Sequence, residues 1–224
     1  MLKRLFEQIR SIEPNVAVLR PLLDPRARAA LIHHFSASAV DALLEKSWAG
    51  YAERRSAVPS QEGIGARVMV HLGALTLAMY DALRSIGQST DDATARVYDV
   101  GWQVYTKMGE VPWVTAEAFS RGEYEKLRFA TKAFRTFPFD APSYQWEDVE
   151  AGPGVVAFNC LRCPVAEYFR AHDASEVCVN TWCKLDYPLA RQWESELERS
   201  GTIAGGAPVC DFRWQAIIST RRPG

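Results

Sequence analysis

The chain has 224 residues, of which 48% are hydrophobic and 24% charged, and its formal net charge is -1. These are ordinary values for a globular protein that is long enough to bury a core of its own. A charge so close to zero provides no attraction to nucleic acid or to an anionic membrane, and no stretch approaches the ~20 apolar residues of a membrane span. We therefore expect a cytoplasmic protein whose partner is a small molecule, with homo-oligomerisation left open.

The first residues carry a basic pair and then apolar side chains at helical spacing, namely Leu5, Phe6, Ile9 and Ile12. This pattern predicts an amphipathic helix rather than a signal peptide, which needs an unbroken apolar stretch and a small-residue cleavage site. The chain has five cysteines. An odd number without a secretion signal favours reduced thiols over a disulfide framework.

Residues 1–140 are predicted to form successive helices. Asp24 followed by proline predicts an N-cap and a helix that runs toward Lys46. An almost wholly apolar helix is expected after Gly63, at the centre of the core, with its end at Gly87. Thr90 begins a third helix, and residues 115–134 are predicted to form a fourth.

The pattern changes after residue 137. Residues 137–146 are rich in proline and aromatic side chains, which predicts a loop. The β-branched run at 154–160 predicts a buried strand, Pro164 opens a helix, and the helical pattern of 175–193 continues at least to Asp186. Residues 194–203 and 209–219 are predicted to be two strands of a hairpin around the turn "AGGAP".

Together these elements predict an α+β fold, in which a helical N-terminal two-thirds packs with a small antiparallel sheet and helices at the C-terminus. Because no repeat or linker divides the chain, we expect a single α+β domain over residues 1–224. It is helical over 1–140 and has β-α-α-β-β order over 150–220.

All five cysteines lie between residues 160 and 210. Cys183 and Asp186 are three residues apart on a predicted helix, which places them on one face with Cβ atoms roughly 5–6 Å apart. Cys210 and Asp211 are adjacent on a predicted strand and so point to opposite faces, unless a bulge beside the glycine turn redirects one of them. We hypothesise that these four residues line one pocket.

A thiol with a pKa near ~8.5 is only slightly ionised at pH 7, so a nucleophilic cysteine needs a base or a nearby cation. Arg199, Arg213 or a histidine can supply the positive charge, and Asp186 would be a general base if it accepted the thiol proton. Buried cysteines are more commonly small hydrophobic residues, which is our interpretation of Cys160 and Cys178.

The cysteine spacing also raises a metal alternative. Cys160 and Cys163 form "CLRC", which suits zinc, although Cys178 and Cys183 match the second half of such a site poorly. If Cys163, Cys183 and Cys210 converged, they would form a three-thiolate site with one open position. The sequence requires no cofactor, so a divalent metal remains the alternative.

Three segments, "RCPVAEYF", "CKLD" and "ERSGTIAGGAPVCDFRW", resemble the L-2-amino-thiazoline-4-carboxylic acid hydrolase family in their order and separation. The resemblance covers roughly residues 160–224. The family pattern is a Cys-Pro before a helix, a Cys-x-x-Asp and a closing Arg-x-x-Thr-Ile-x-x-Gly-x-x-x-Cys-Asp-Phe-Arg. It falls here on Cys163, Pro164, Cys183, Asp186, Arg199, Thr202, Ile203, Gly206, Cys210, Asp211, Phe212 and Arg213. The chain departs from it at Val209, Pro188 and Ser200-Gly201.

This resemblance implies a hydrolase that opens a small thiazoline or cyclic amidine ring at a C=N or amide-like C–N bond, and not a peptidase. Either Cys183 or Cys210 attacks the sp² carbon, or Asp186 or Asp211 activates a water. Arg199 and Arg213 suit a bidentate clamp for a substrate carboxylate. Further substrate-binding candidates are Cys163, Thr202, Gly206 and His71, although a histidine in an apolar helix is more typical of the core.

Two other functions fit the same residues. One is a non-catalytic small-molecule- or metal-binding domain, similar to the vinyl-reductase-type ligand-binding domains of sensors. The other is a biosynthetic tailoring enzyme that keeps the fold and acts on a different bond. Turnover of a cyclic amidine separates the hydrolase from the binding domain.

Overall fold

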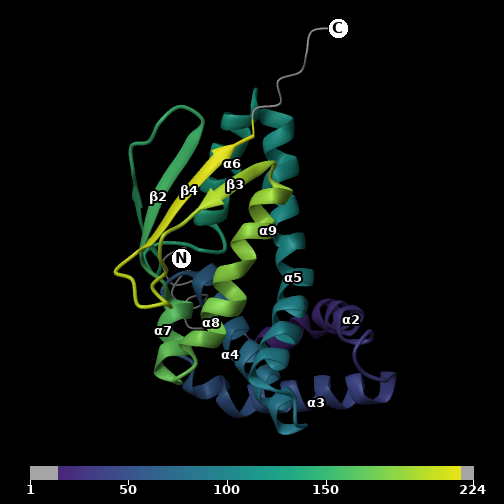
Figure 1. The fold of residues 1–224 in the computed structure, drawn as a ribbon. Helices are drawn as coiled ribbons and strands as arrows, with labels where there is room; N and C mark the ends of the chain where they lie inside the picture. The colour runs from purple at the N-terminus through teal and green to yellow at the C-terminus, as the bar shows by residue number, and fades with distance from the viewer. Residues whose placement is uncertain (1–14, 218–224) are drawn as a thin grey trace, which may run out of the picture.

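The computed structural model describes residues 15–217 (Figure 1). The helix expected near Leu5 lies outside the described residues. The N-terminal helical elements are η1 (Val16–Leu19), α2 (Arg20–Leu31), α3 (Ala37–Arg54), η2 (Arg55–Ala57), α4 (Ile64–Ser85), α5 (Thr90–Phe119) and α6 (Glu123–Thr136). None of the helices within 15–217 has the length and hydrophobicity that crossing a membrane requires.

The C-terminal part contains both strands and helices. In chain order these are β1 (Gln145–Asp148), β2 (Val155–Arg162), α7 (Pro164–Ala171), α8 (Ser175–Cys178), η3 (Val179–Cys183), α9 (Lys184–Gln192), β3 (Ser195–Glu198) and β4 (Cys210–Ala216). The predicted α+β class is confirmed.

The four strands form one antiparallel sheet in the order β1-β2-β4-β3. In the pairing of β2 with β4, Cys160 lies opposite Cys210 and Phe158 opposite Phe212. Every second residue of β4, beginning with Cys210, is buried, so one face of the strand belongs to the core. The pairing of β3 with β4 confirms the predicted hairpin, although β3 ends at Glu198 and residues 199–203, predicted as strand, lie in the connection to β4.

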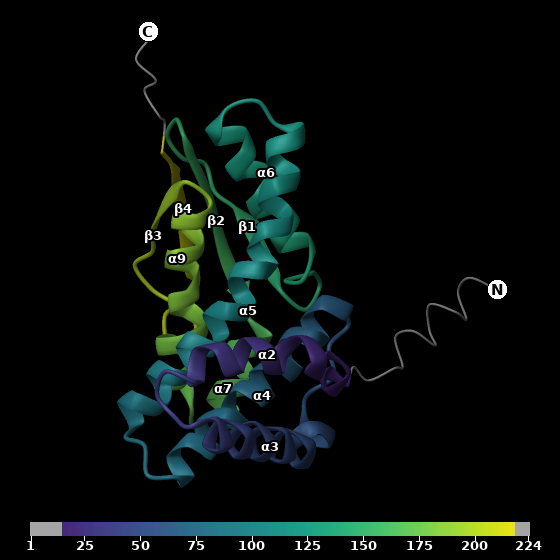
Figure 2. The same cartoon turned by 90° about the vertical axis from the view of Figure 1, so that its right-hand side faces the viewer.

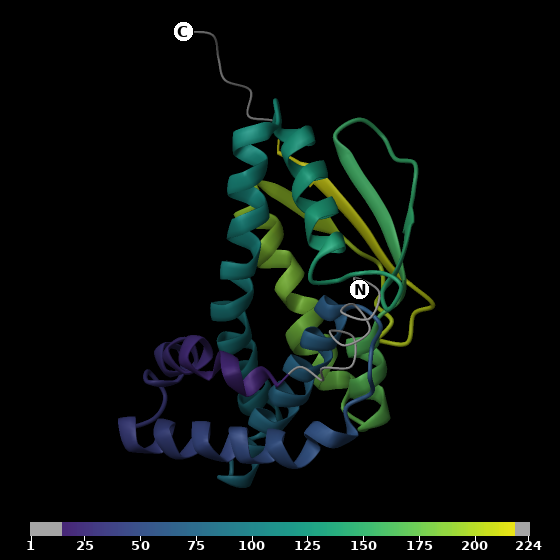
Figure 3. The same ribbon diagram turned by 180° about the vertical axis from the view of Figure 1, so that it is seen from behind.

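Helices cover the buried face of this sheet. α6 contacts β2 and β4, α9 contacts β3, and both helices pack against α5. Figures 1 and 3 show α5 running along the molecule with α6 and α9 beside it and the sheet packed on this layer. Figure 2 shows α2 and α3 at the end of the molecule below the sheet. The sheet and its helices thus enclose the aromatic and cysteine side chains of β2 and β4.

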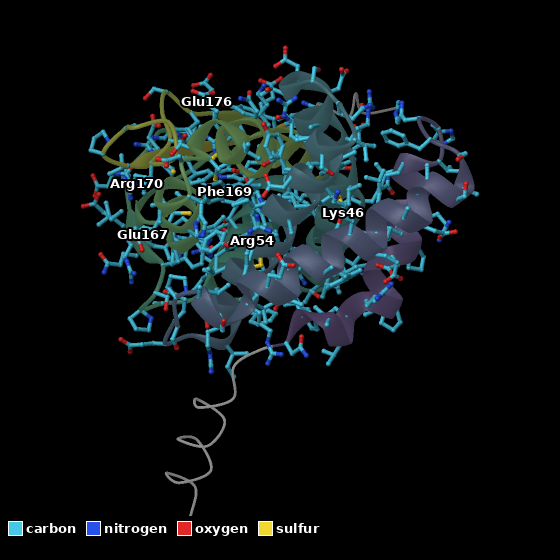
Figure 4. All side chains as sticks on the ribbon, turned by 90° about the horizontal axis from the view of Figure 1, so that it is seen from below. Lys46, Arg54, Glu167, Phe169, Arg170 and Glu176 are labelled. Atoms are coloured by element: carbon cyan, nitrogen blue, oxygen red, sulfur yellow. The ribbon has the colours of Figure 1, made fainter. Side chains whose placement is uncertain are left out.

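Figure 4 shows the molecule from below and labels three residues of α7, namely Glu167, Phe169 and Arg170. On α7, Phe169 is fully buried, whereas Arg170 is exposed and Glu167 forms an ion pair with Arg162. This is the amphipathic pattern expected of a helix that packs on a core, and it confirms the helix predicted after Pro164.

The predicted helix cap at Asp24 is wrong. α2 begins at Arg20 and ends at Leu31, and a separate helix, α3, begins at Ala37. The Asp24 carboxylate accepts a hydrogen bond from Trp48 Nε1 at 2.7 Å, a contact between helices that local sequence does not reveal.

Two other boundaries differ from prediction. Residues 115–134 do not form one helix, because α5 continues to Phe119 and Gly122 then takes a φ of 91° before α6 begins. This left-handed conformation favours glycine and ends the helix. Gln145–Asp148 is an edge strand whose hydrogen bonds come from β2, although its first two residues were predicted as loop.

Candidate functional site

A cavity of about 90 Å³ lies between the sheet and the layer of α5, α6, η3 and α9. All five cysteines line it, together with aromatic side chains such as Phe212 and Trp214 and with Asp186 and Arg199. An apolar pocket with a few converging polar groups is the usual setting of a small-molecule site. We therefore take this cysteine-lined cavity as the candidate active site.

A second cavity of about 90 Å³ lies among α2, α3, α4, α5 and η3 and shares Tyr105 and Trp182 with the first. Its lining is almost wholly apolar, and its Asp24 already accepts hydrogen bonds from Trp48 and Arg20. The two cavities are similar in size, but the buried ionisable groups converge on the cysteine-lined one.

Asp186 is the anionic centre of the cysteine-lined cavity. Tyr105 Oη donates to its Oδ1 at 2.8 Å, and Arg199 Nη1 donates to its Oδ2 at 2.7 Å. Arg199 Nη2 donates to the carbonyl of Cys183 at 2.6 Å. The side chains of Arg199 and Asp186 are 3% and 14% exposed. The ion pair is therefore buried, and each partner is held by further hydrogen bonds.

Burial raises the pKa of Asp186, and the opposing effects of Arg199 and Tyr105 reduce that shift without cancelling it. Burial acts against the cationic form of Arg199 too, but the Asp186 carboxylate outweighs it and raises the Arg199 pKa. Burial, together with the charge of Asp186, raises the pKa of Tyr105, which stays a hydrogen-bond donor. A carboxyl group whose pKa lies closer to neutrality is suited to proton transfer.

Cys210 is the thiol whose pKa the surroundings lower. The main cause is a hydrogen bond with the Cys160 thiol, which burial opposes and which the Ile203 N–H and the positive charge of Arg199 reinforce. The Ile203 N–H donates to Cys210 Sγ at 3.2 Å. The same thiol–thiol hydrogen bond, together with burial, raises the pKa of Cys160. The Cys160 thiol also donates to the Arg162 carbonyl at 3.1 Å, while the Ile203 N–H and Arg199 both favour the thiolate form of Cys210.

The other three cysteines are placed differently. Cys163 caps α7 by accepting the Ala166 N–H at 3.4 Å, and burial raises the pKa of its thiol. Cys178 and Cys183 are the N-cap and the last residue of the π-helical turn η3, and their separation of five residues equals the hydrogen-bonding repeat of a π-helix. A hydrogen bond with the Cys183 thiol, with burial, raises the pKa of Cys178.

The structure brings Cys183, Asp186 and Cys210 to one cavity and places Asp211 outside it, on the opposite face of β4. Asp211 accepts the Ser200 N–H, the Ser200 hydroxyl and the Gly201 N–H. Burial opposes ionisation of Asp211, but these hydrogen bonds outweigh it and lower its pKa to about 2. Asp211 therefore holds the segment after β3 onto β4.

Two further candidates also have structural partners outside the cavity. Arg213 donates to the carbonyls of Phe158 and Phe212 and to Asn159 Oδ1. His71 is buried in α4, where its Nδ1 lies 2.9 Å from Tyr51 Oη.

The two candidates from the glycine turn shape the connection between β3 and β4. Thr202 Oγ1 accepts the Gly205 N–H at 3.0 Å, and Gly206 has a φ of 92°. This conformation favours glycine. The turn carries Ile203 back to the thiol of Cys210, so these residues act on the site through backbone geometry.

Sequence reasoning missed several residues of the cavity. Tyr105 comes from the middle of α5, Arg135 from α6 and Tyr144 from the segment before β1. Their positions in the sequence carry no signal, because only the packing of α5 and α6 on the sheet brings them there. Trp214 had a signal, since it has the same parity as Cys210 on one strand and therefore shares its face.

The metal alternatives find no support in the geometry. Within residues 15–217, no group of three or more histidine, cysteine, aspartate or glutamate side chains is arranged to hold a metal ion. Neither the three-thiolate set of Cys163, Cys183 and Cys210 nor a four-cysteine zinc site is therefore formed in this part of the chain.

The fold and the site define an α+β protein with a buried, cysteine-lined cavity. Residues 67–214 match the sequence model of the L-2-amino-thiazoline-4-carboxylic acid hydrolase family. This match spans more than half of the chain, and the chain belongs to that family. The matched region begins in α4, well before the residues 160–224 that carry the motif resemblance. It therefore includes Tyr105, Arg135 and Tyr144. Membership supports a hydrolase-type function at the level of the family.

No curated protein matches the chain in sequence. Among solved structures, the crystal structure of Fe(II) unliganded H-NOX protein from K. algicida is similar, with a TM-score of 0.44 and 10% sequence identity. The similarity covers 90% of this chain and 98% of that chain.

Proposed function

We propose that the protein hydrolyses a small ring at a C=N carbon, in a thiazoline or a related cyclic amidine, inside the cysteine-lined cavity. The observation that carries this proposal is the meeting of two groups in one apolar cavity: the Cys210 thiol, whose pKa is lowered, and the Asp186 carboxyl, whose pKa is raised. Together they supply a nucleophile and a group that exchanges protons. Membership of the hydrolase family supports the same reaction class.

The size of the cavity favours a small substrate. Its volume of about 90 Å³ is below the ~150 Å³ of an engineered apolar cavity that binds benzene. A peptide or a polymer is too large for such a cavity.

The first step is addition of Cys210 to the ring. Asp186 accepts the thiol proton, Sγ forms a bond to the sp² carbon, and the electron pair of the C=N bond moves to the ring nitrogen. Asp186 then gives the proton to that nitrogen, so the tetrahedral adduct is neutral and the carboxylate is restored. Arg199 and Tyr105 hold the two oxygens of Asp186 throughout, which limits the reorganisation that the proton transfers require.

The second step opens the ring and consumes one water. Collapse of the adduct breaks one ring bond to the attacked carbon as an N–H nitrogen on that carbon forms a new C=N bond and releases its proton, through Asp186, to the departing heteroatom. Water then adds to the same carbon, and one of its protons passes through Asp186 to the C=N nitrogen. The carbon–Sγ bond breaks as the remaining hydroxyl becomes a carbonyl, and the hydroxyl proton passes through Asp186 to Cys210, which restores the thiol and the carboxylate. The sum of the two steps is the addition of one water across a ring bond, with both side chains regenerated.

The test is turnover of L-2-aminothiazoline-4-carboxylate, followed as loss of the ring chromophore with and without chelator. Cys210→Ala should abolish turnover. Cys183→Ala, the matched control in the same cavity, should retain it, because the pKa of the Cys210 thiol is set by Cys160, Ile203 and Arg199. Turnover by Cys210→Ala at the wild-type rate would remove the thiol from the mechanism. Tight binding of the ring without turnover would support a ligand-binding domain instead.

A further inference from the structure

Three hydrogen-bond donors of the cysteine-lined cavity have no partner among the described residues. They are the hydroxyl of Tyr144, Nε1 of Trp214 and Nε of Arg135. Tyr144 and Trp214 are 2% and 3% exposed. A buried donor without an acceptor destabilises the folded state, and natural proteins keep few of them. Three on the wall of one cavity therefore point to an acceptor that arrives with a ligand.

Other hydrogen-bond donors on the wall of the same cavity have protein acceptors. In the same cavity Trp146 Nε1 donates to the Phe139 carbonyl and Trp193 Nε1 to the Gly109 carbonyl, both at 2.9 Å. Tyr105 likewise donates to Asp186. The packing thus satisfies the other donors where a protein acceptor is within reach.

Arg135 is placed to receive an anion. Its guanidinium lies 4.2 Å from the ring centroid of Phe158, and its side chain is 17% exposed. Its Nη1 donates to Asp148 at 2.6 Å, but the side chain of Asp148 is 80% exposed. Exposed ion pairs of this kind contribute little free energy. The inward side of the guanidinium therefore remains available to a second carboxylate.

The two arginines expected from the sequence as carboxylate clamps are already engaged. Arg199 binds Asp186 and the Cys183 carbonyl. Arg213 binds carbonyls on the outward side of the sheet. Arg135 is thus the arginine of the cavity wall whose inward nitrogen lacks a protein acceptor within residues 15–217.

The three donors are spread along the cavity. Tyr144 stacks on Trp146, which is the β1 partner of Cys160, so its hydroxyl belongs to the end with the thiols. Trp214 lies four residues beyond Cys210 on β4, roughly 13 Å along a strand, and Arg135 lies over Phe158 between these ends. Burial raises the pKa of Tyr144, which keeps its hydroxyl protonated as a donor.

We propose that Arg135 and Trp214 bind the carboxylate of a small planar ring and that Tyr144 donates a hydrogen bond to an acceptor atom of the ring beside Cys210. Such a ring is oriented with its carboxylate away from the thiols. The identity of the reaction rests on the proposed function, whereas the binding geometry does not.

The experiment measures binding of thiazole-4-carboxylate, whose C=N bond is part of an aromatic ring and resists hydrolysis, and of thiazole as the matched compound without carboxylate. We expect the wild type to bind the carboxylate more tightly, and Tyr144→Phe and Trp214→Phe to weaken its binding about tenfold each. Arg135→Gln should weaken it at least as much and remove the preference over thiazole. Arg213→Gln, the control arginine outside the cavity, should leave binding unchanged.

A second measurement separates a ligand-binding role from a structural one. Because the Tyr144 hydroxyl has no protein acceptor in the described part of the chain, Tyr144→Phe should raise the melting temperature of the unliganded protein while it weakens binding. If Trp214→Phe does not fold, Tyr144→Phe and Arg135→Gln carry the test. Equal binding of thiazole and its carboxylate, or unchanged affinity in these two variants, would overturn the inference.

Turnover measured in parallel distinguishes this inference from the proposed function. Binding that depends on Arg135 and Tyr144 without turnover of any cyclic amidine contradicts the hydrolase alone. Turnover that Arg135→Gln leaves unaffected contradicts the binding geometry alone.

Discussion

The two faces of β4 have different chemistry although their residues alternate in one short segment. Cys210 and Trp214 face the cavity, where one has a thiol of lowered pKa and the other an indole N–H without an acceptor in residues 15–217. Asp211 and Arg213 face outward and are fully engaged in hydrogen bonds to neighbouring segments. The comparison teaches that a contiguous motif can divide its residues between reaction and stability, because a strand sends adjacent side chains to opposite sides.

The largest expected effect comes from replacing each of the adjacent residues Cys210 and Asp211 in turn. Cys210→Ala should lower kcat/KM for L-2-aminothiazoline-4-carboxylate by roughly 10³-fold or more, since the nucleophile is lost. Asp211→Asn should leave kcat/KM within about threefold of the wild type at pH 7. Steady-state kinetics on both variants checks the division. A larger loss in Asp211→Asn than in Cys210→Ala would reverse it.

The next largest effect is expected at the buried ion pair. Arg199→Gln leaves the Asp186 carboxylate buried without its cation, which should lower the free energy of unfolding by about 3 kcal/mol at pH 7. Without Arg199 the pKa of Asp186 rises further, so the deficit should shrink as the pH falls and the carboxyl becomes protonated. Urea unfolding at several pH values tests this. Arg213→Gln, on the outward face, should cost less than about 1 kcal/mol.

A smaller effect on the free energy of unfolding is expected for Asp211, the acid on the outward face of β4. The folded-state pKa of Asp211 is about 2, below the ~3.9 of an unfolded aspartate. The stabilisation by Asp211 is therefore fully present above pH ~4 and is lost as the pH falls through 2. Asp211→Asn should lower the free energy of unfolding by about 1 kcal/mol at pH 7, allowing for solvent screening. A difference from the wild type that is as large at pH 2 as at pH 7 would contradict this assignment.

The smallest expected change in the free energy of unfolding is an increase, in Tyr144→Phe. Tyr144→Phe should raise the free energy of unfolding by up to about 1 kcal/mol, because it removes a buried hydroxyl without a protein acceptor in the described chain. Tyr105→Phe is the matched control and should lower it, since that hydroxyl donates to Asp186. Thermal unfolding of the two variants tests whether the Tyr144 hydroxyl in the cysteine-lined cavity lacks an acceptor until a ligand binds. Destabilisation by both would indicate that the Tyr144 hydroxyl has a structural role.

Much of the fold was predictable from local pattern. The apolar helix up to Gly87, the strand that ends near Cys160, the helix after Pro164 and the final hairpin all follow from periodicity and turn residues. The cap at Asp24 failed because Trp48, on another helix, is the partner of that carboxylate. The edge strand β1 was missed because its hydrogen bonds come from β2 and not from its own residues.

The site was predictable in part. The helical spacing of Cys183 and Asp186 and the parity of Cys210 in a strand are local properties, and the structure brings these three residues together. The role of Arg199 as partner of Asp186, rather than as a free clamp, depends on how the segment after β3 crosses α9. Tyr105, Arg135 and Tyr144 reach the cavity only through packing of distant segments.

What the sequence determined by itself is therefore the set of elements and the face of each element that carries chemistry, since 3.6-residue and two-residue periodicities act over a few neighbours. What the tertiary structure decided is which faces meet and which polar groups are left without a protein partner. Those outcomes depend on contacts between residues far apart in the chain, such as Tyr105 with Asp186. Burial in the assembled core then shifts the pKa values of the groups enclosed there.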